Sequence, residues 1–406
     1  MTLKSASFAK DLLNRKLRIR YAHQREQWHG HHLLQGSPIP ADGVNLISND
    51  YLSIAGHQRI TNAQTHFLNN GDNPNVMSAV FLEEGDFQHQ IEAKFARWMD
   101  ADTTAFCQSG YAANTGLIQS LLDNESFPVY TDMLAHMSLW DGVTMGGGTA
   151  VPFRHNDMRH LDRLIRQYGP GLVVVDAIYS TTGTVCPLQE MVNIARHHGC
   201  LILVDESHSL GVCGPAGSGL VCELGLTDEV HFRTASLAKA FASRAGIVTC
   251  PPGYKDCFNT SSKQFIFSSA LLPHEVAGLD ATLDLIASAD ARRTRLQRNS
   301  RYMRDAIRAL GIDIGESASQ IIPLVAGEEW GTITLRKALE KRGLFGSPFC
   351  APATAKKRSL IRLSVNAALE PAQCDKAIDA IAGAAASDYA GDWRCYRQLQ
   401  KRATAA

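Results

Sequence analysis

The chain has 406 residues, of which 45% are hydrophobic and 20% charged, so it can form two or three domains with a large core. Its formal net charge is zero, which argues against nucleic acid or an anionic membrane surface as a partner. The basic N-terminal segment has no apolar stretch before a small-residue cleavage site, and no apolar run is long enough to span a bilayer. We therefore expect a cytoplasmic protein without membrane insertion. The basic start could be a transit peptide, but it is more typical of an amphipathic first helix.

The ten cysteines are scattered between Cys107 and Cys395, and no two of them form a Cys-x-x-Cys pair. Disulfide scaffolds are typical of small secreted chains, and a zinc site needs closely spaced ligands. The pattern therefore predicts buried thiols in a reducing compartment and no metal site.

The predicted elements divide the chain into an arm, a large domain and a small domain. Residues 1–44 form the arm, which is partly helical. Residues 45–290 alternate short β-rich runs with helical patterns, which predicts an α/β domain with a mostly parallel central sheet. The predicted strands are Thr103–Gln108, Val129–Thr131, Leu172–Ala177, Leu201–Val204, His231–Thr234 and Gly246–Cys250, and Leu188–His197 is a crossover helix.

The run Leu172–Val175 is apolar at consecutive positions rather than at alternate ones, which is typical of a strand buried on both faces. After about residue 290 charged helical patterns dominate, and residues 291–406 are predicted to form a smaller C-terminal α+β domain. Its predicted elements are the helices Arg292–Leu310, Thr334–Arg342 and Cys374–Ala384 and the strands Ile321–Val325 and Leu360–Val365.

Asp205 follows the predicted buried strand that begins at Leu201. In open α/β sheets, ligands bind at the carboxyl edge of the strands, where this side chain is expected to lie. Most aspartates in such positions only cap a strand. An acid there can also hold a ring nitrogen protonated, which pyridoxal 5'-phosphate (PLP) requires in order to act as an electron sink.

Lys239 follows the next predicted strand and stands 34 residues after Asp205, among alanine, leucine and phenylalanine. A single lysine is usually a solvated surface residue, but these neighbours indicate burial. A desolvated lysine has a lowered pKa and becomes an amine that can react with carbonyl groups. The Ser236 hydroxyl, three residues earlier, could reach a phosphate oxygen.

Ser109, Gly110 and Tyr111 stand between a predicted strand and a predicted helix. A Ser-Gly pair is usually only a turn, but the backbone N–H groups at the start of a helix form an anion site. His136 lies near another predicted strand end. A single histidine is more often a packed core residue, and the alternative is a ring stacked on a cofactor.

Together and in this order, these segments resemble the α-oxoamine synthases, which are PLP-dependent enzymes of fold type I. The resemblance extends from about residue 45 to about residue 385. The matching segments are Ser48–Leu52, Ser109–Tyr111 with Asn114, Asp132 with His136 and Ser138, His155–Asp157, Asp205 with His208, Ser236 with Lys239, Phe267–Ser269, and Arg362 within a Leu-Ile-Arg-Leu-Ser frame.

The resemblance implies a role for each matched residue. Lys239 is implied as the Schiff-base lysine and as the base that takes the Cα proton. Asp205 is implied as the partner of the pyridine nitrogen, and His208 as the partner of the phenolic oxygen. His136 is implied as the ring stacked on the cofactor, and Ser180 as a residue near it. Ser109, Gly110, Tyr111 and Ser236 are implied around the phosphate, together with Ser268 and Ser269 from the second subunit of a homodimer. Asn49 and Arg362 are implied as the pair that binds the substrate carboxylate.

Two segments depart from the family members that use glycine or alanine. Asn75–Leu82 replaces a Gly- and Arg-rich stretch, and Ala367–Leu369 stands where those members have a histidine. The Met-Ser-Ala-Val-Phe stretch is instead similar to the α-hydroxyketone autoinducer synthases, which make long-chain aminoketone precursors of quorum-sensing signals. Further segments similar to theirs are Ala135–Trp140, Tyr168–Gly183, Val204–Gly211, Thr234–Lys239 and Phe345–Thr354.

The resemblance therefore implies a PLP-dependent acyltransferase that condenses a fatty acyl-CoA with S-adenosylmethionine or 2-aminobutyrate. CoA and CO2 leave, and the product is a long-chain α-aminoketone. One alternative is another α-oxoamine synthase, such as 8-amino-7-oxononanoate synthase, 2-amino-3-ketobutyrate CoA ligase or serine palmitoyltransferase; the two departing segments argue against it. A second alternative is a non-catalytic partner subunit, which is expected to have lost Lys239 or Asp205, and both are present.

Overall fold

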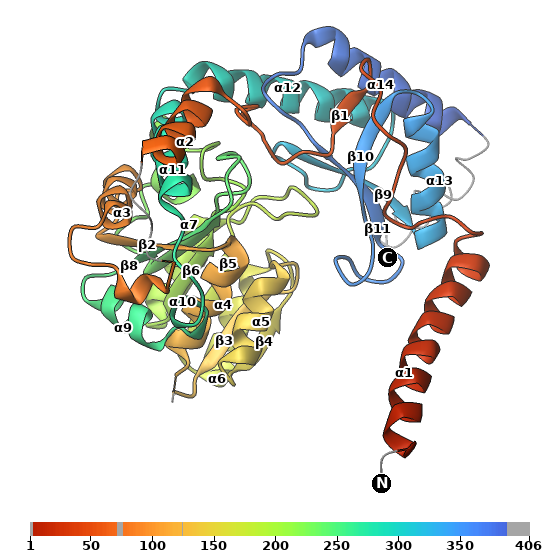
Figure 1. The fold of residues 1–406 in the computed structure, drawn as a ribbon. Helices are drawn as coiled ribbons and strands as arrows, with labels where there is room; N and C mark the ends of the chain where they lie inside the picture. The colour runs from red at the N-terminus through yellow and green to blue at the C-terminus, as the bar shows by residue number, and fades with distance from the viewer. Residues whose placement is uncertain (1–2, 71–75, 124, 388–406) are drawn as a thin grey trace.

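Two β-sheets organise the chain in the computed structural model, which describes residues 3–70, 76–123 and 125–387 (Figure 1). The larger sheet has seven strands, in the order β2-β8-β7-β6-β5-β3-β4. They are β2 (Thr103–Cys107), β8 (Gly246–Cys250), β7 (Phe232–Ser236), β6 (Leu201–Asp205), β5 (Leu172–Asp176), β3 (Pro128–Asp132) and β4 (Thr149–Phe153). Only β8 runs antiparallel to its neighbours, so the predicted α/β fold with a mostly parallel sheet is confirmed.

The inner strand β5 is fully buried, and its apolar side chains alternate between two separate hydrophobic clusters. Val173 and Val175 pack in one cluster, with α6 (Met158–Tyr168) and α7 (Leu188–His197). Leu172 and Val174 pack in the other, with α4 (Gly110–Leu121) and α5 (Met137–Met145). This arrangement explains the consecutive apolar residues of the strand, since helices cover both faces of the sheet.

Helices surround the larger sheet on both faces (Figure 1). They are α2 (Gln58–Asn70), α3 (Phe87–Trp98), α4 (Gly110–Leu121), α5 (Met137–Met145), α6 (Met158–Tyr168), α7 (Leu188–His197), α8 (Leu220–Glu223), α9 (Tyr254–Ser261), α10 (Lys263–Ile266) and α11 (Pro273–Ala287), with the 3-10 turns η2 (Ala79–Phe81) and η3 (Pro215–Gly217). Several begin at a side-chain cap, which satisfies one of the N–H groups that a helix start leaves unpaired. Asp86 accepts from Gln88 N at 2.8 Å at the start of α3, and Asp157 accepts from His160 N at 2.9 Å at the start of α6.

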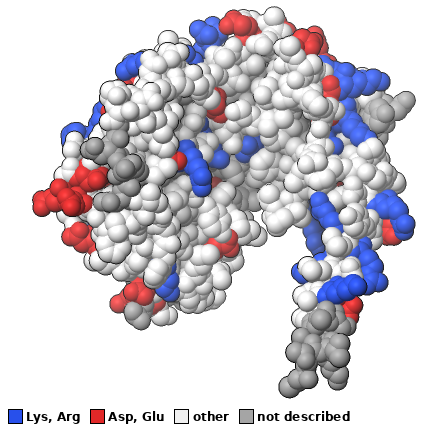
Figure 2. Space-filling model, in the orientation of Figure 1, with Lys and Arg blue, Asp and Glu red and all other residues white. Residues whose placement is uncertain are grey.

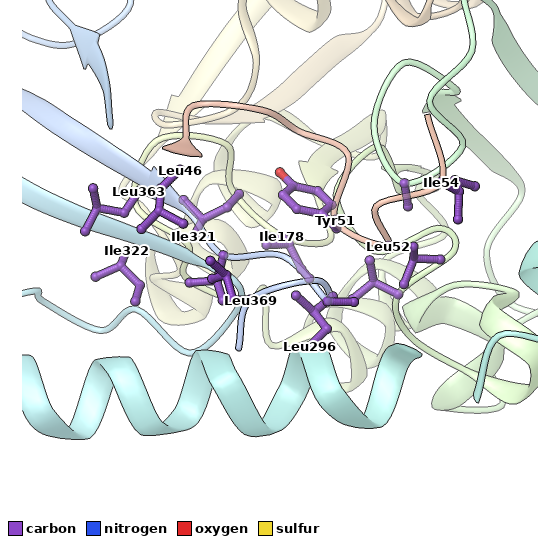
Figure 3. Packing of buried hydrophobic residues seen from close by; sticks show 14 of the residues in the cluster. Leu46, Tyr51, Leu52, Ile54, Ile178, Leu296, Ile321, Ile322, Leu363 and Leu369 are labelled. Carbon is purple, nitrogen blue, oxygen red and sulfur yellow. The ribbon is translucent and has the colours of Figure 1, made fainter. Parts of the chain in front are cut away.

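The smaller sheet has the order β1-β10-β11-β9; two helices pack against its strands, and a third packs against one of these helices. Its elements are β1 (Val44–Leu46), β10 (Leu344–Phe349), β11 (Ser359–Ser364), β9 (Ile321–Gly327), α12 (Asp290–Ala309), α13 (Glu329–Glu340) and α14 (Pro371–Ala386). One hydrophobic cluster joins these elements to residues of the larger part. Figure 3 shows Tyr51, Leu52 and Ile178 of that cluster together with Leu296 and Ile321.

The structure contains three strands that the sequence patterns did not predict. β4 contains Pro152 and lies at the edge of its sheet, where a missing N–H is tolerated. β10 contains Gly346 and Pro348, both of which are depleted in strands. Its Pro348 is tolerated because β1 pairs only with the first three residues of β10. β1 itself is short, and it pairs with the C-terminal sheet although the predicted domain boundary falls within it.

The N-terminal arm begins with the long helix α1 (Leu3–Ala22), followed by the π-helical turn η1 (His23–Gln27). Figure 1 shows α1 projecting away from both sheets, and Figure 2 shows basic side chains along it. Trp28 anchors the arm, because its Nε1 donates to Glu329 Oε2 on α13 at 2.7 Å. Among the helices of the described residues, none has the length and hydropathy needed to cross a membrane.

Candidate active site

Three neighbouring strands of the larger sheet end in polar residues at the same edge. Because β5, β6 and β7 are parallel, Asp176 lies beside Asp205, and Asp205 beside Thr234. Lys239 follows β7 in the turn that leads to β8. The structure thus brings the predicted acid and the predicted amine to the carboxyl edge of a parallel sheet, where ligands bind in this class of fold. Figure 2 shows a hollow between the two parts of the molecule, with basic atoms inside it.

Asp205 is 3% exposed, and a hydrogen-bond donor reaches each of its carboxylate oxygens. Asn114 Nδ2 donates to Oδ2 at 2.7 Å, and Ser207 N donates to Oδ1 at 2.8 Å. The Asn114 amide oxygen in turn accepts from the Thr234 hydroxyl. Each carboxylate oxygen keeps a further lone pair, so Asp205 can still accept a hydrogen bond from a protonated ring nitrogen.

Lys239 is half-buried beside this carboxylate. Burial lowers the pKa of its ammonium group, and the positive charge of Arg362 lowers it further, whereas Asp205 raises it. A lowered pKa increases the fraction of neutral amine, the form that attacks carbonyl groups and accepts protons.

The start of α4 lies directly against the end of β7. Ser109 caps α4 by accepting from Ala112 N at 3.1 Å. A Cβ added to Gly110 would lie 2.5 Å from Ser236 Cβ, so only glycine allows this approach. The N–H groups of Gly110 and Tyr111 belong to the first helical turn, which has no partner within the helix. This helix start has the free N–H groups that can bind an anion, with Ser236 beside it.

His136 caps the start of α5 at the same edge of the sheet. Its backbone N donates to Asp176 Oδ1 at 3.2 Å, and its Nδ1 lies 2.7 Å from Ser138 Oγ. Ser138 Oγ also accepts from Asn114, the residue that holds Asp205. Burial, and then the neighbouring Asp205 carboxylate, hold the pKa of Asp176 well above its usual range. The His136 ring is exposed, so it can stack on a ligand.

His208 is 5% exposed, and its Nδ1 lies 2.7 Å from the Tyr51 hydroxyl. Its carbonyl accepts from Gln320 Nε2 at 2.8 Å. Burial first, and then the charges of Lys239, Arg362 and His136, hold the pKa of His208 well below its usual range. Burial also raises the pKa of Tyr51 to about 12, so its hydroxyl stays protonated. A Tyr51 hydroxyl that donates to Nδ1 leaves the proton of a neutral imidazole on Nε2, where it can be donated to a ligand.

Arg362 extends from β11 of the smaller sheet and is 4% exposed. Its Nη2 donates to Asn49 Oδ1 at 2.7 Å, and its Nη1 donates to the Ser180 carbonyl at 3.0 Å. The guanidinium also lies 4.4 Å from the ring centroid of Phe349. Its Nε is buried and has no hydrogen-bond partner among the described residues. The predicted pair Asn49 and Arg362 is thus in contact, with one buried donor left for a ligand.

Ser268 and Ser269 lie beside Gln108 of the same chain, the residue that precedes Ser109. Ser268 Oγ donates to Gln108 Oε1 at 2.8 Å, and Gln108 Nε2 donates to the Ser269 carbonyl. A contribution of these serines to the site of a second subunit stays a prediction.

The two departing segments take different positions. Asn75 lies outside the described residues. Met77 and Ser78 lie against the segment that contains Ser268 and Ser269. Ser78 forms a β-bridge with Ser269, and the Met77 carbonyl accepts a hydrogen bond from Ala270 N at 2.7 Å. Ala367 N donates to Tyr51 O at 2.8 Å, and Leu369 is buried. Both segments therefore contact elements of the candidate site.

Several residues of the site had no predicted role, among them Tyr51, Gln108, Asn114, Asp176, Thr234 and Gln320. Asp176 did have a usable signal, because it stands next to the end of one predicted strand, as Asp205 stands next to the end of another. Gln320 had none, since its contact with His208 depends on how the two parts of the chain pack.

The fold and this edge of the sheet define a class of protein. Residues 41–381 match the family model described as aminotransferase class I and II, which covers most of the chain, and the chain belongs to that family. The predicted relationship to the α-oxoamine synthases is also confirmed by the relatives and structures that the chain resembles.

The chain is 42% identical over 349 residues to the CAI-1 autoinducer synthase of Vibrio campbellii, a match that covers 86% of this chain and 88% of that protein. It is 33% identical over 353 residues to the 8-amino-7-oxononanoate synthase of Anaeromyxobacter dehalogenans, covering 86% and 89%. A high-resolution structure of SPT with PLP internal aldimine superposes with a TM-score of 0.78 at 27% identity, covering 84% and 86%.

Proposed function

We propose that this chain is a PLP-dependent acyltransferase that condenses a fatty acyl-CoA with an α-amino donor, S-adenosylmethionine or 2-aminobutyrate. CoA and CO2 leave, and the product is a long-chain α-aminoketone, the precursor of an α-hydroxyketone signal. The observation that carries the proposal is the meeting of Lys239, Asp205 and His208 at one strand edge, in a chain 42% identical to an autoinducer synthase.

The residues present fit PLP at several of its groups. Because residue 110 is glycine, the start of α4 lies close to Ser236, and the free N–H groups at this helix start can bind the phosphate. Asp205 can accept a hydrogen bond from the ring nitrogen, and Nε2 of His208 can donate one to the phenolic oxygen. The exposed ring of His136 can stack on the cofactor. Bound here, PLP supplies an electron sink for the electron pair left on the donor's Cα.

The chain's own residues hold and move the remaining groups. Lys239 Nζ, with its lowered pKa, accepts the proton from the donor's Cα. Arg362 and Asn49 bind the donor carboxylate, and the unpartnered Nε of Arg362 provides a buried donor for it. Ser180, whose carbonyl is already hydrogen-bonded to Arg362, lies beside this contact.

Product mass tests the proposal most directly. Purified protein is incubated with PLP, decanoyl-CoA and one amino donor at a time, and the products are weighed by mass spectrometry. A decanoyl aminoketone from S-adenosylmethionine or 2-aminobutyrate is expected. Product from glycine, alanine or serine alone would support another α-oxoamine synthase instead.

Replacement of the lysine separates catalysis from a non-catalytic role. Lys239→Ala is expected to abolish both the visible absorbance of the bound cofactor and product formation. The matched control is Lys341→Ala, since Lys341 is exposed at the end of α13. Unchanged absorbance and product with Lys239→Ala would contradict the proposed role.

We also infer a cytoplasmic homodimer whose site is shared between subunits. Mixing Lys239→Ala with Ser268→Trp, followed by subunit exchange, tests this. If Ser268 serves the partner's site, heterodimers regain one intact site each, or about a quarter of the wild-type activity in a statistical mixture. If the mixture regains no activity, the site is not shared between subunits in this way. Cell fractionation tests the cytoplasmic location separately.

A further inference from the structure

A short loop links the two parts of the molecule beside Arg362. We call residues 178–185, which follow β5, the β5 loop. Ile178 and Val185 form a β-bridge at its base, and Tyr179 N donates to Thr184 O at 3.0 Å. The loop is therefore closed on itself, and whatever holds Thr184 also fixes the path of the chain at Ser180.

On the side of the larger sheet, a chain of hydrogen bonds ends in this loop. Asp132, fully buried at the end of β3, has its Oδ1 3.0 Å from His155 Nδ1. His155 Nε2 lies 2.8 Å from Thr184 Oγ1, which lies 2.8 Å from Thr182 Oγ1. One consistent set of donors runs along it: Nδ1 donates to Asp132, and the Thr184 hydroxyl donates to Nε2.

The order acid, imidazole and hydroxyl also occurs in hydrolases, where the hydroxyl is a nucleophile. Here the Thr184 hydroxyl is committed to His155 and Thr182, and Thr184 is only 6% exposed. A nucleophile must reach a bound substrate, so the geometry favours a structural use of this chain. The His155 ring also packs edge-on against the Tyr179 ring of the loop, with centroids 4.4 Å apart.

On the side of the smaller sheet, the β5 loop contacts two segments. The Gly183 carbonyl accepts from Ala318 N at 3.0 Å and from Ser319 Oγ at 2.9 Å. The Ser180 carbonyl accepts from Arg362 Nη1 at 3.0 Å. Arg362 thus has two hydrogen-bond partners, Asn49 and Ser180, besides its contact with the Phe349 ring, and only Ser180 belongs to the loop.

We propose that Asp132, His155 and Thr184 are positioning residues for the amino donor: they fix the β5 loop, and its Ser180 carbonyl aims Arg362 at the donor carboxylate. The inference rests on the proposed function, in which Arg362 binds that carboxylate. None of the three residues needs to touch the substrate for this effect. Loss of the chain of hydrogen bonds should weaken recognition of the carboxylate and leave recognition of the amine unchanged.

The test compares two amines that differ in the carboxylate. Binding of 2-aminobutyrate and of 1-aminopropane to the PLP-loaded protein is followed by the change in cofactor absorbance. Thr184→Val, which replaces the hydroxyl with a methyl group of similar size, is expected to raise the Kd of 2-aminobutyrate about five- to tenfold. The Kd of 1-aminopropane should stay within about twofold of the wild-type value.

Matched variants complete the test. Thr184→Ser restores the hydroxyl and is expected to return the Kd of 2-aminobutyrate toward the wild-type value, while Thr260→Val controls for the same change at an exposed position. In steady state, KM for the donor should rise more than kcat falls. If Thr184→Val does not fold, His155→Gln is measured in the same way.

Equal weakening of both amines, or no weakening of 2-aminobutyrate, would overturn the inference. The proposed function fails separately, when the wild-type protein shows no absorbance change with any amine and forms no aminoketone.

Discussion

The Tyr51 hydroxyl lies 2.7 Å from Nδ1 of His208, and both side chains are buried where the two parts of the chain meet. When the Tyr51 hydroxyl donates in this contact, the proton of the neutral imidazole lies on Nε2. It also joins the segment before α2 to the loop after β6, so it contributes to the packing as well as to the site.

Tyr51→Phe should therefore affect catalysis more than the fold. Without the hydroxyl, Nδ1 can hold the proton, and Nε2 then loses its role as a donor. We expect kcat/KM to fall about five- to tenfold and the free energy of unfolding to fall by about 1 kcal/mol. Steady-state kinetics and urea unfolding measure the two effects. The control is Tyr168→Phe at an exposed tyrosine, and equal kcat/KM for wild type and Tyr51→Phe would contradict the assignment.

Burial of His208 predicts how stability depends on pH. The pKa of His208 lies well below 6.5 in the folded chain and returns to its ordinary value on unfolding. Below about pH 6.5 the unfolded state binds this proton more readily, so the free energy of unfolding falls as the pH falls. This residue contributes a slope of up to about 1.4 kcal/mol per pH unit.

Urea unfolding of wild type and His208→Gln at several pH values between about 5 and 8 isolates this effect. The variant cannot titrate at this position, so its stability should depend less steeply on pH. A constant difference in stability between the two proteins over the whole range would show that His208 does not titrate in this way.

Asp205→Asn is expected to keep the fold and lose the reaction. The amide oxygen can keep one of the two hydrogen bonds that Asp205 accepts, from Asn114 or from Ser207 N, but the amide cannot supply the negative charge. We expect product formation to fall by about 10²–10³-fold with bound cofactor still present. Single-turnover measurements on cofactor-loaded protein check this, and activity within about tenfold of wild type would argue that the charge is not needed.

Gly110→Ala tests the phosphate site. Its Cβ would lie 2.5 Å from Ser236 Cβ, so the helix start and the end of β7 must separate. We expect the affinity for PLP to fall at least about tenfold, measured by titration of the apoprotein. The control is Gly383→Ala in α14, where the new Cβ meets only the flexible Arg342 side chain. Equal PLP affinity in both variants would place the phosphate elsewhere.

The sequence patterns predicted local features better than packing between distant segments. The apolar run of β5 predicted a strand covered on both faces, because each face of a buried strand needs apolar side chains. β10 was missed because its Gly346 and Pro348 disfavour strands, and pairing with β1 and β11 outweighs that preference.

The same limit applies to the site. Asp205 and Lys239 could be proposed from strand ends and neighbours in sequence, and the family resemblance added roles for both. The contacts of Arg362 with Ser180 and of His208 with Gln320 join segments more than a hundred residues apart. No spacing in the chain encodes such contacts, because they follow from how the two sheets are placed.

The pairing of β1 with β10 has a consequence for folding during translation. Val44 leaves the ribosome before its strand partner Leu344, which follows about 300 residues later. At roughly 5–20 residues per second, translation leaves β1 without its neighbour for about 15–60 s. During that interval the larger sheet can already assemble, so β1 pairs with β10 only after all strands of that sheet have been synthesised.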